Sequence, residues 1–260
     1  MDRYHICGIN LSSVNTYNYL KKKKIKVTIS DIKDKYKINK KFLKKINKKD
    51  IFFGLHPAER LARANKVIIS SGFIKKEKEY KNYIKNNKYI SELEIFYKFK
   101  DWKKSSILLV TGSKGKTTLC KKILKILKQT KKYKNIYYID RKKYTFSNIP
   151  ESTKKSFLIV EIDYQTLLIA KSLKAKYRIS SSFSYTQNKA FENNKLYLTA
   201  KRKIKNGLKE NDILILDHSS KMNFNFSNKS VVNIRKCDIK KKNNLIIKNI
   251  IPLIKKNFNE

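Results

Sequence analysis

The segment LLVTGSKGKTT, residues 108–118, joins an apolar run to a turn with two glycines, which Lys116 and two threonines follow. An apolar strand that enters a helix through such a turn directs backbone N–H groups and a helix N-terminus toward an anion. The spacing, G-x-x-G-K-T, is shorter than the common G-x-x-x-x-G-K-S/T pattern. The segment therefore predicts a site for the phosphates of a nucleoside triphosphate. Its expected lining is Gly112, Ser113, Lys114, Gly115, Lys116, Thr117 and Thr118.

An acidic residue, Glu161, ends a second apolar run within FLIVEID. Ligands of open α/β sheets gather at the carboxyl ends of the strands, where Glu161 and Thr117 are both expected. A lone acid at a strand end is more often a solvated cap, but the turn described above favours a metal site. We expect the Thr117 hydroxyl and the Glu161 carboxylate to bind Mg²⁺, with Lys116 on the outer phosphates.

Strand-like and helix-like segments alternate along the chain, which predicts an α/β fold with parallel sheets and covering helices. The polar segment YKFKDWKK (97–104) separates two such series and indicates two domains, 1–98 and 99–260. The expected strands are 4–9, 25–30, 51–55, 66–70, 105–111, 135–140, 156–163 and 212–218. The expected helices are 12–24, 75–87, 91–100, 116–129 and 196–206. After Ser219 the sequence indicates one strand and a short terminal helix.

The charge is strongly positive: 63 lysines and arginines stand against 20 acidic residues, for a net charge of +43. A basic protein of this kind suggests nucleic acid, but only seven of the cations are arginine, the residue best suited to base and phosphate contacts. Lys, Asn, Ile, Tyr and Phe, which have A/T-rich codons, are abundant, while Gly and Pro, which have G/C-rich codons, are few. A genome biased toward A and T explains this composition better than selection for nucleic-acid binding. We therefore expect no specific nucleic-acid partner, and weak salt-sensitive binding to polyanions.

The chain carries three scattered cysteines and no apolar run near the roughly 20 residues that span a bilayer. Cysteines without pairing or metal-ligand spacing are typical of reduced cytosolic thiols. The sequence therefore predicts a cytoplasmic protein without a membrane span.

At TGSKGKTT (111–118) the sequence resembles the ATP-binding turn of the Mur ligase family, usually T-G-S/T-N-G-K-S/T-T. Further segments resemble the branch of the family that adds D-glutamate, in the same order along the chain. These are ICGINLSSVNTYNYLKKKKIKVTISD (6–31), VIISSGF (67–73), ISELEIFYKF (90–99), FSNIP (146–150), FLIVEID (157–163) and YLTAKRKI (197–204). The resemblance runs from residue 4 to about residue 218.

This resemblance implies a Rossmann-like domain for a UDP-linked substrate over residues 1–98, and a P-loop-type ATP-binding domain over residues 99–260. Lys116, Glu161 and Lys201 match catalytic positions, and Lys201 matches a lysine whose carbamate binds metal in the family. Matching positions for the uridine nucleotide are Leu11, Ser12, Asp31 and Gly72, and Asn148 matches a contact to the muramoyl group.

The reaction that the resemblance implies is part of peptidoglycan precursor synthesis in the cytoplasm. ATP, with Mg²⁺, would activate the carboxylate of UDP-N-acetylmuramoyl-L-alanine as an acyl phosphate, which the amine of D-glutamate then attacks. The family also has a third domain that carries the amino-acid site. About 40 residues follow Ser220, too few for such a domain, so we expect the C-terminal ligase domain to be absent and a separate chain to supply it if catalysis survives.

Several positions depart from the family pattern. The turn asparagine is Lys114, the uridine turn keeps one glycine in Gly8–Ser13, and the segment 183–190 lacks the usual histidine. These departures leave a second hypothesis open, in which the chain is a relic that binds a nucleotide or a UDP-sugar without catalysis. A folate-polyglutamylating ligase shares the ATP turn, but the matches before residue 100 favour the D-glutamate branch.

Overall fold

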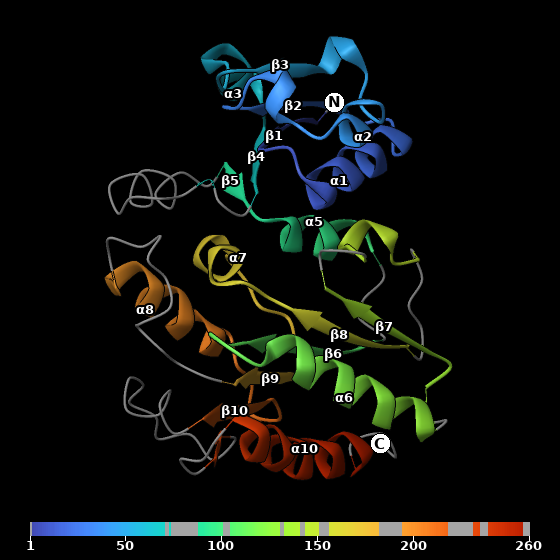
Figure 1. Cartoon of the computed structure of the whole chain (residues 1–260), viewed down its shortest axis with the longest axis vertical. Coiled ribbons are helices and arrows are strands. Elements are labelled where there is room, and N and C mark those ends of the chain that lie inside the picture. Colours follow the sequence, from blue (N-terminus) through green and yellow to red (C-terminus); the bar gives the residue numbers. More distant parts are fainter. Residues whose placement is uncertain are drawn as a thin grey trace. The chain divides into compact units, whose positions relative to one another are not determined.

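The computed structural model describes residues 2–70, 73, 88–100, 105–130, 133–140, 144–150, 156–181, 194–217, 231–234 and 239–256. The chain forms two compact units (Figure 1). One comprises Met1–Lys100, Arg141–Glu151 and Ile169–Lys171, and the other comprises Asp101–Asp140, Ser152–Leu168 and Ser172–Glu260. The predicted domain boundary at residues 98 and 99 stays a prediction.

The first unit is built on a parallel five-stranded sheet in the order β3-β2-β1-β4-β5. Its strands are β1 (Arg3–Cys7), β2 (Lys26–Asp31), β3 (Ile51–Phe53), β4 (Lys66–Ile69) and β5 (Tyr89–Ile90). β2 and β4, which flank the central strand β1, are rich in β-branched residues, as expected where both faces of a parallel sheet are buried. The carboxyl ends of β1 and β2 lie side by side, since Cys7 is in register with Ser30.

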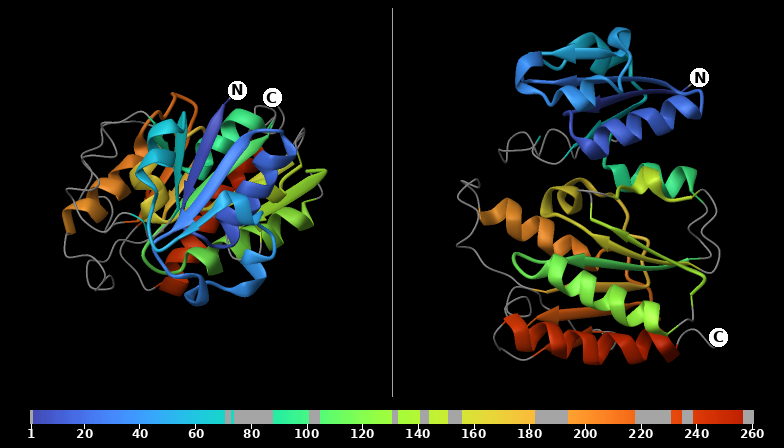
Figure 2. Two further views of the ribbon diagram at one scale, coloured as in Figure 1. Left: turned by 90° about the horizontal axis from the view of Figure 1, so that it is seen from above. Right: turned by 45° about the vertical axis from the view of Figure 1, so that its right-hand side comes forward.

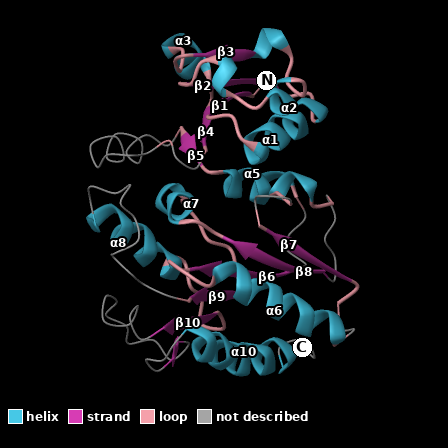
Figure 3. Cartoon of the chain, viewed as in Figure 1, coloured by secondary structure: helices cyan, strands magenta, loops and turns pink. Residues whose placement is uncertain are grey.

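The first unit also contains helices and short 3₁₀ turns (Figure 3). They are α1 (Leu11–Lys22), η1 (Lys35–Lys37), α2 (Lys40–Leu43), η2 (Lys48–Asp50), α3 (Ala58–Arg63), α5 (Glu92–Phe99) and η3 (Phe146–Asn148). Asn10 begins α1 as a capping box, because its side chain accepts from the Ser13 N–H and the Ser13 side chain accepts from the Asn10 N–H. Val14, Tyr17 and Leu20 then bury one face of α1 against the sheet.

The second unit has a parallel six-stranded sheet in the order β11-β10-β9-β6-β8-β7. Its strands are β6 (Ser106–Thr111), β7 (Asn135–Ile139), β8 (Ser156–Glu161), β9 (Tyr177–Ser180), β10 (Ile213–Asp217) and β11 (Val231–Ile234). β6 lies between β8 and β9, so residues that follow β6 emerge between the ends of two neighbouring strands.

The helical elements of the second unit are α6 (Lys116–Gln129), α7 (Tyr164–Ile169), α8 (Asn194–Arg202), η4 (Lys203–Lys205) and α10 (Ile239–Lys256). α6 and α10 lie against each other and against the sheet, as Figures 1 and 2 show. Ile123 and Leu127 of α6 join Ile246, Ile250 and Ile254 of α10 in one buried cluster with the strands. This buried cluster fixes α6 against the sheet and so positions the turn that precedes the helix.

The predicted α/β fold with parallel sheets is confirmed, and α6 has the predicted bounds. The structure adds β5 and β9, which the sequence did not predict, and α10 has 18 residues where a short helix was expected. The predicted helix 75–87 lies outside the described residues. Within the described ranges, no helix is both long and apolar enough to cross a bilayer.

Candidate functional site

The turn between β6 and α6 is held by the backbone of its second glycine. Gly115 precedes α6 with φ +79°, a left-handed conformation that favours glycine. The side chain of Lys116 folds back over the turn, and its Nζ donates to the Gly112 carbonyl at 2.6 Å. The first N–H groups of α6 and the Lys116 ammonium therefore belong to one short turn, which is the arrangement that phosphate binding requires.

Three polar side chains converge beside the turn. Thr117 Oγ1 lies 2.9 Å from each oxygen of the Glu161 carboxylate, and the Tyr138 hydroxyl donates to Glu161 Oε2 at 2.7 Å. The register explains the meeting, because Glu161 at the end of β8 pairs with Val110 of β6. Burial, and then the hydrogen bond to Glu161, raise the pKa of Tyr138, so its hydroxyl keeps its proton. A hydroxyl and a carboxylate on a part-exposed surface are the oxygen donors that Mg²⁺ prefers, so these residues fit that ion.

Lys201 enters the same region from α8. Lys201 is 1% exposed. Its Nζ donates at 2.8 Å to the Oγ1 atom of Thr111, which is the last residue of β6. Burial, and then the nearby Lys116 charge, hold the pKa of Lys201 well below the usual lysine value. A lowered pKa favours the neutral amine, which is the form that reacts with carbon dioxide to give a carbamate. The environment of Lys201 is therefore compatible with the carbamylation that the family resemblance implied.

This burial makes the stability of the protein depend on pH. The unfolded chain binds a proton at Lys201 over a pH range in which the folded chain does not, so the free energy of unfolding rises with pH up to the ordinary lysine pKa. Compared with Lys201→Met, the wild-type protein should gain up to about 1 kcal/mol in its free energy of unfolding per pH unit in this range. Urea unfolding at pH 7, 8, 9 and 10 in buffers free of carbon dioxide measures this gain.

Lys209→Met is the control, because Lys209 is exposed in the same unit. If the wild type, Lys201→Met and Lys209→Met share one pH slope, Lys201 is not a buried, proton-poor amine.

The other predicted residues of the ATP turn do not share the contacts of Lys116 and Thr117. The Ser113 hydroxyl is hydrogen-bonded to the Tyr197 hydroxyl, and the side chains of Lys114 and Thr118 are exposed. Ser181, which follows β9, donates its N–H to the Thr111 carbonyl at 2.8 Å and its hydroxyl to the same oxygen at 3.2 Å. Tyr138, Ser181 and Tyr197 could not be predicted as site residues, since serines and tyrosines occur throughout this chain.

In the first unit, the turn after β1 is organised by a carboxylate. Asp31 Oδ2 accepts the Ile9 N–H at 2.7 Å, and Asp31 Oδ1 accepts the Lys33 N–H at 2.9 Å. The Ser12 side chain is buried, and its hydroxyl donates to Glu92 Oε2. Leu11 is half-buried at the start of α1. The structure therefore brings Asp31 to the predicted turn, while it directs the Ser12 hydroxyl to another protein group.

Asn148, the predicted contact to a muramoyl group, is an exposed residue of η3. Its Oδ1 accepts the Thr145 N–H at 3.0 Å and the Asn15 amide at 3.3 Å, which places it beside α1. Gly72, predicted for the uridine nucleotide, lies outside the described residues.

Gly8 is required at its position for two separate reasons. Its φ is +97°, and a Cβ at this residue would lie 1.9 Å from Ser70 Oγ. We expect Gly8→Ala to lower the free energy of unfolding by about 2–3 kcal/mol, from backbone strain together with the clash. Urea unfolding measures the loss.

Gly54→Ala separates the two causes, because Gly54 has φ +79° but its nearest neighbour, Asp34 Oδ1, is 3.9 Å from the added Cβ. Gly54→Ala should cost less than Gly8→Ala, and Ser70→Ala should restore part of the loss in the Gly8→Ala background. Equal costs at the two glycines would contradict the clash.

Two of the three histidines lie together in the first unit, near Cys7. The Ser30 hydroxyl lies 2.7 Å from His5 Nε2 and 2.6 Å from His56 Nδ1, and His5 Nδ1 lies 2.8 Å from Thr28 Oγ1. Burial lowers the pKa of His5 to about 4, so its ring is neutral near pH 7. These hydrogen bonds engage both ring nitrogens of His5 and one ring nitrogen of His56.

Comparison with known proteins places the fold. No family model matches the sequence, and no curated protein matches it either. The solved UDP-N-acetylmuramate:L-alanyl-γ-D-glutamyl-meso-diaminopimelate ligase from Neisseria meningitidis is similar, with a TM-score of 0.54 and 14% identity over 90% of this chain and 78% of that chain.

Two further solved structures are similar at lower TM-scores. The UDP-N-acetylmuramate–alanine ligase from Thermotoga maritima has a TM-score of 0.47 and 17% identity, over 91% of this chain and 53% of that chain. A pseudomurein peptide ligase of type C from Methanothermus fervidus has a TM-score of 0.41 and 20% identity, over 89% of this chain and 48% of that chain. This chain thus spans about half the length of each of these two proteins.

Two of the three are named as UDP-N-acetylmuramate ligases and one as a pseudomurein peptide ligase, and none is named as an enzyme that adds D-glutamate alone. At such low identities, similarity of structure supports a common fold and leaves the activity to be argued from the site. The chain therefore shares the α/β fold of the Neisseria ligase over most of its length.

Proposed function

We propose that this chain binds ATP–Mg²⁺ and acts as the nucleotide- and substrate-binding part of a Mur-type ligase of peptidoglycan precursor synthesis. The observation that carries the proposal is the meeting of Thr117 with Glu161 directly beside the Lys116 turn. A phosphate-binding turn alone would support any nucleotide-binding protein. The carboxylate on the neighbouring strand and the buried Lys201 favour phosphoryl transfer over simple binding, and a carboxylate as the acceptor is what the family resemblance implies.

Each residue then has a physical role. The N–H groups of residues 112–118 would bind phosphate oxygens, and Lys116 would leave the Gly112 carbonyl to offset charge on the transferring phosphoryl group. Thr117, Glu161 and a carbamylated Lys201 would hold Mg²⁺, which when bound supplies positive charge to the phosphates. The Tyr138 hydroxyl would orient Glu161. In the first unit, Asp31 and the Gly8–Ser13 turn would bind a UDP-linked substrate, together with Leu11, Gly72 and Asn148.

The finer proposal is that the substrate is UDP-N-acetylmuramoyl-L-alanine and the added amino acid is D-glutamate. It rests on the segments before residue 100 that resemble the D-glutamate branch. The names of the solved relatives supply the competing reactions: addition of alanine, or of an L-alanyl-γ-D-glutamyl-diaminopimelate peptide, to UDP-N-acetylmuramate.

A panel of these three donor–acceptor pairs with ATP and Mg²⁺ tests the proposal. Product should form, with phosphate release, only when UDP-N-acetylmuramoyl-L-alanine and D-glutamate are both present, and Glu161→Gln should lower the rate by at least about 100-fold. Product from one of the other two pairs would support a ligase activity and show that its substrates differ from those proposed. ATP binding without product from any pair would contradict the ligase.

That last outcome would favour a second candidate function, a non-catalytic module that binds a nucleotide or a UDP-sugar. Two observations favour it: Lys114 replaces the usual asparagine of the turn, and the Ser12 hydroxyl is engaged by Glu92. A module of this kind predicts saturable binding of ATP or UDP-sugar that Lys116→Ala or Asp31→Asn weakens selectively.

A further inference from the structure

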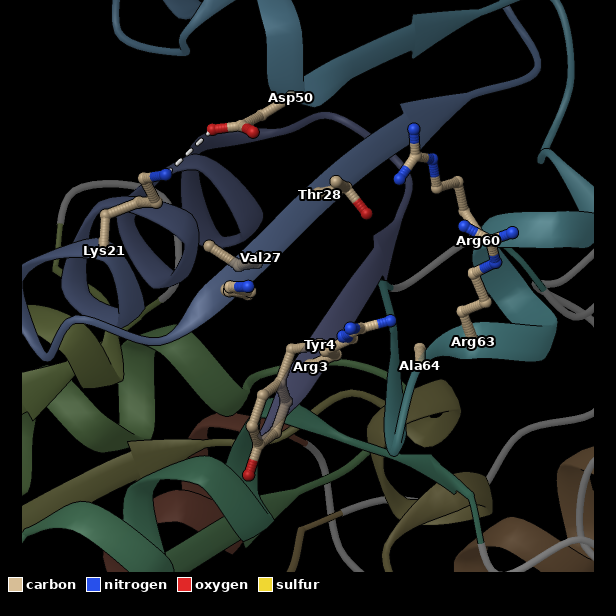
Figure 4. A pocket seen from close by; sticks show the side chains of 10 residues that line it. Arg3, Tyr4, Lys21, Val27, Thr28, Asp50, Arg60, Arg63 and Ala64 are labelled. Carbon is tan, nitrogen blue, oxygen red and sulfur yellow. Dashed lines mark ion pairs between the residues drawn. The ribbon is translucent and has the colours of Figure 1, made fainter. Parts of the chain in front are cut away.

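A recess of about 370 Å³ lies in the first unit, lined by the first residues of β1 and β2 and by residues of α1 and α3 (Figure 4). Arg3 begins β1 and Lys26 begins β2, so the recess is at the amino ends of these strands. The predicted substrate turn follows Cys7, at their carboxyl ends. The lining residues are Arg3, Tyr4, Lys21, Lys26, Val27, Thr28, Asp50, Arg60, Arg63 and Ala64.

The charges around this recess are unbalanced. Among the described residues that line it, the one acidic residue, Asp50, is already engaged by Lys21 at 3.0 Å and by the Tyr17 hydroxyl at 2.6 Å. Arg63 is paired with Glu59 at 3.1 Å. In the described part of the chain, Arg3, Lys26 and Arg60 make no ion pair with a carboxylate. The recess therefore presents three cations whose charge is not offset by any acidic side chain that the structure describes.

The kind of cation is also unusual for this protein. The chain has seven arginines among its 63 basic residues, and the three within residues 1–100 are Arg3, Arg60 and Arg63. All three line the recess. A drift toward lysine explains a basic surface but gives no reason for arginines to gather at one place. Guanidinium groups bind phosphate oxygens through two parallel hydrogen bonds, which an ammonium group cannot do.

Figure 4 shows how these side chains lie: Arg3 extends from β1, and Arg60 and Arg63 extend from α3, around the same recess. Thr28 projects between them, and its hydroxyl, which is 2.8 Å from His5 Nδ1, can make further hydrogen bonds. The Tyr4 hydroxyl points away from the arginines and accepts from Lys98 Nζ at 2.9 Å. The polar groups that face the recess are thus mainly hydrogen-bond donors.

We propose that this recess binds a small molecule through a diphosphate group, at a site separate from the ATP turn. Two guanidinium groups and one ammonium group match the charge of a diphosphate. The volume of about 370 Å³ falls within the range of small-molecule sites and admits a ligand of mononucleotide size. Free diphosphate and a nucleoside diphosphate share this chemistry, and the test includes both.

The test uses the full chain with Lys116→Ala, which weakens the ATP turn so that the recess can be observed. Calorimetric titration with inorganic diphosphate, and separately with ADP, at 0.15 M salt should show saturable binding of at least one probe. Adding Arg3→Gln with Arg60→Gln should weaken that binding by about tenfold or more, because each lost charge-assisted hydrogen bond contributes to affinity.

Lys40→Gln with Lys44→Gln removes the same charge from exposed positions of the same unit that do not line the recess. This pair should change the affinity by less than about twofold, as expected of distant exposed charges screened by salt. All variants should fold, because the substituted positions are exposed or half-buried, and far-UV circular dichroism checks this. An equal loss in both double variants, or no saturable binding of either probe, would overturn the proposal.

Discussion

Lys116→Ala is expected to weaken the binding of ATP–Mg²⁺ by about 100-fold and to leave the chain folded. The ammonium group is held over the turn by the Gly112 carbonyl, at 2.6 Å, so it is already close to where phosphates would bind. A charge-assisted hydrogen bond contributes about 1.5–3 kcal/mol, and 2.7 kcal/mol corresponds to about 100-fold in affinity. Isothermal titration calorimetry at 0.15 M salt measures the change.

The control for this variant is Lys121→Ala, because Lys121 is an exposed residue of the same helix. Loss of one positive charge from a protein of net charge +43 should by itself have little effect at this ionic strength. Similar losses in Lys116→Ala and Lys121→Ala would show that ATP binds through diffuse charge, and the assigned turn would then be wrong.

Arg178→Met is expected to give the largest loss of stability, about 3–5 kcal/mol. Arg178 is fully buried in β9, and its guanidinium donates to backbone carbonyls that would be left without donors. The acceptors are Leu173 at 2.6 Å, Ala175 at 3.1 Å, Ile204 at 2.9 Å, Asn206 at 2.7 Å and Gly207 at 3.3 Å. Burying unsatisfied carbonyls is costly because each loses its hydration on folding.

Urea unfolding measures this loss, with Arg202→Met as the control at an exposed arginine of the same unit. Arg178→Lys should fall between the wild type and Arg178→Met, since an ammonium group can replace part of the donor set. If Arg178→Met proves too unstable to purify, the lysine variant still reports the effect. A cost below about 1 kcal/mol for both variants would contradict the role of the buried guanidinium.

Arg178 also explains why one strand escaped prediction from the sequence. β9 reads Tyr-Arg-Ile-Ser, and an arginine inside a short segment breaks the apolar run that marks a buried strand. Its hydrogen bonds to backbone carbonyls form only in the folded chain, so no local sequence pattern predicts them. α10 was underestimated for a similar reason: lysines and asparagines alternate with its isoleucines, and Pro252 suggests an earlier end.

The strand, turn and helix around residues 106–129 were predictable because each signal is local. An apolar run defines β6, glycines allow the turn, and period-3.6 apolar positions define α6. The partner of Thr117 could also be anticipated, since Glu161 ends a second apolar run and parallel strands end at the same edge. Tyr138, Ser181 and Tyr197 could not, because their contacts depend on strand order, and tyrosine is frequent in this chain.

Ser12 shows the opposite limit of sequence reasoning. Its position matches a substrate-binding residue of the family, yet its hydroxyl donates to Glu92, which is far away in the sequence. A match of position predicts where a residue lies along the chain, while its hydrogen-bond partner depends on the packing of α1 against α5.

The central claim is that the turn at residues 112–118 binds the triphosphate of ATP, and a site-resolved titration tests it most directly. Backbone amide resonances of the full chain should be followed by NMR as ATP–Mg²⁺ is added at 0.15 M salt. The account predicts saturable shifts, largest at the amides of residues 112–118, and Lys116→Ala should move their midpoint to an ATP concentration about 100-fold higher. Unchanged resonances for these amides, while ATP binds elsewhere or not at all, would contradict it.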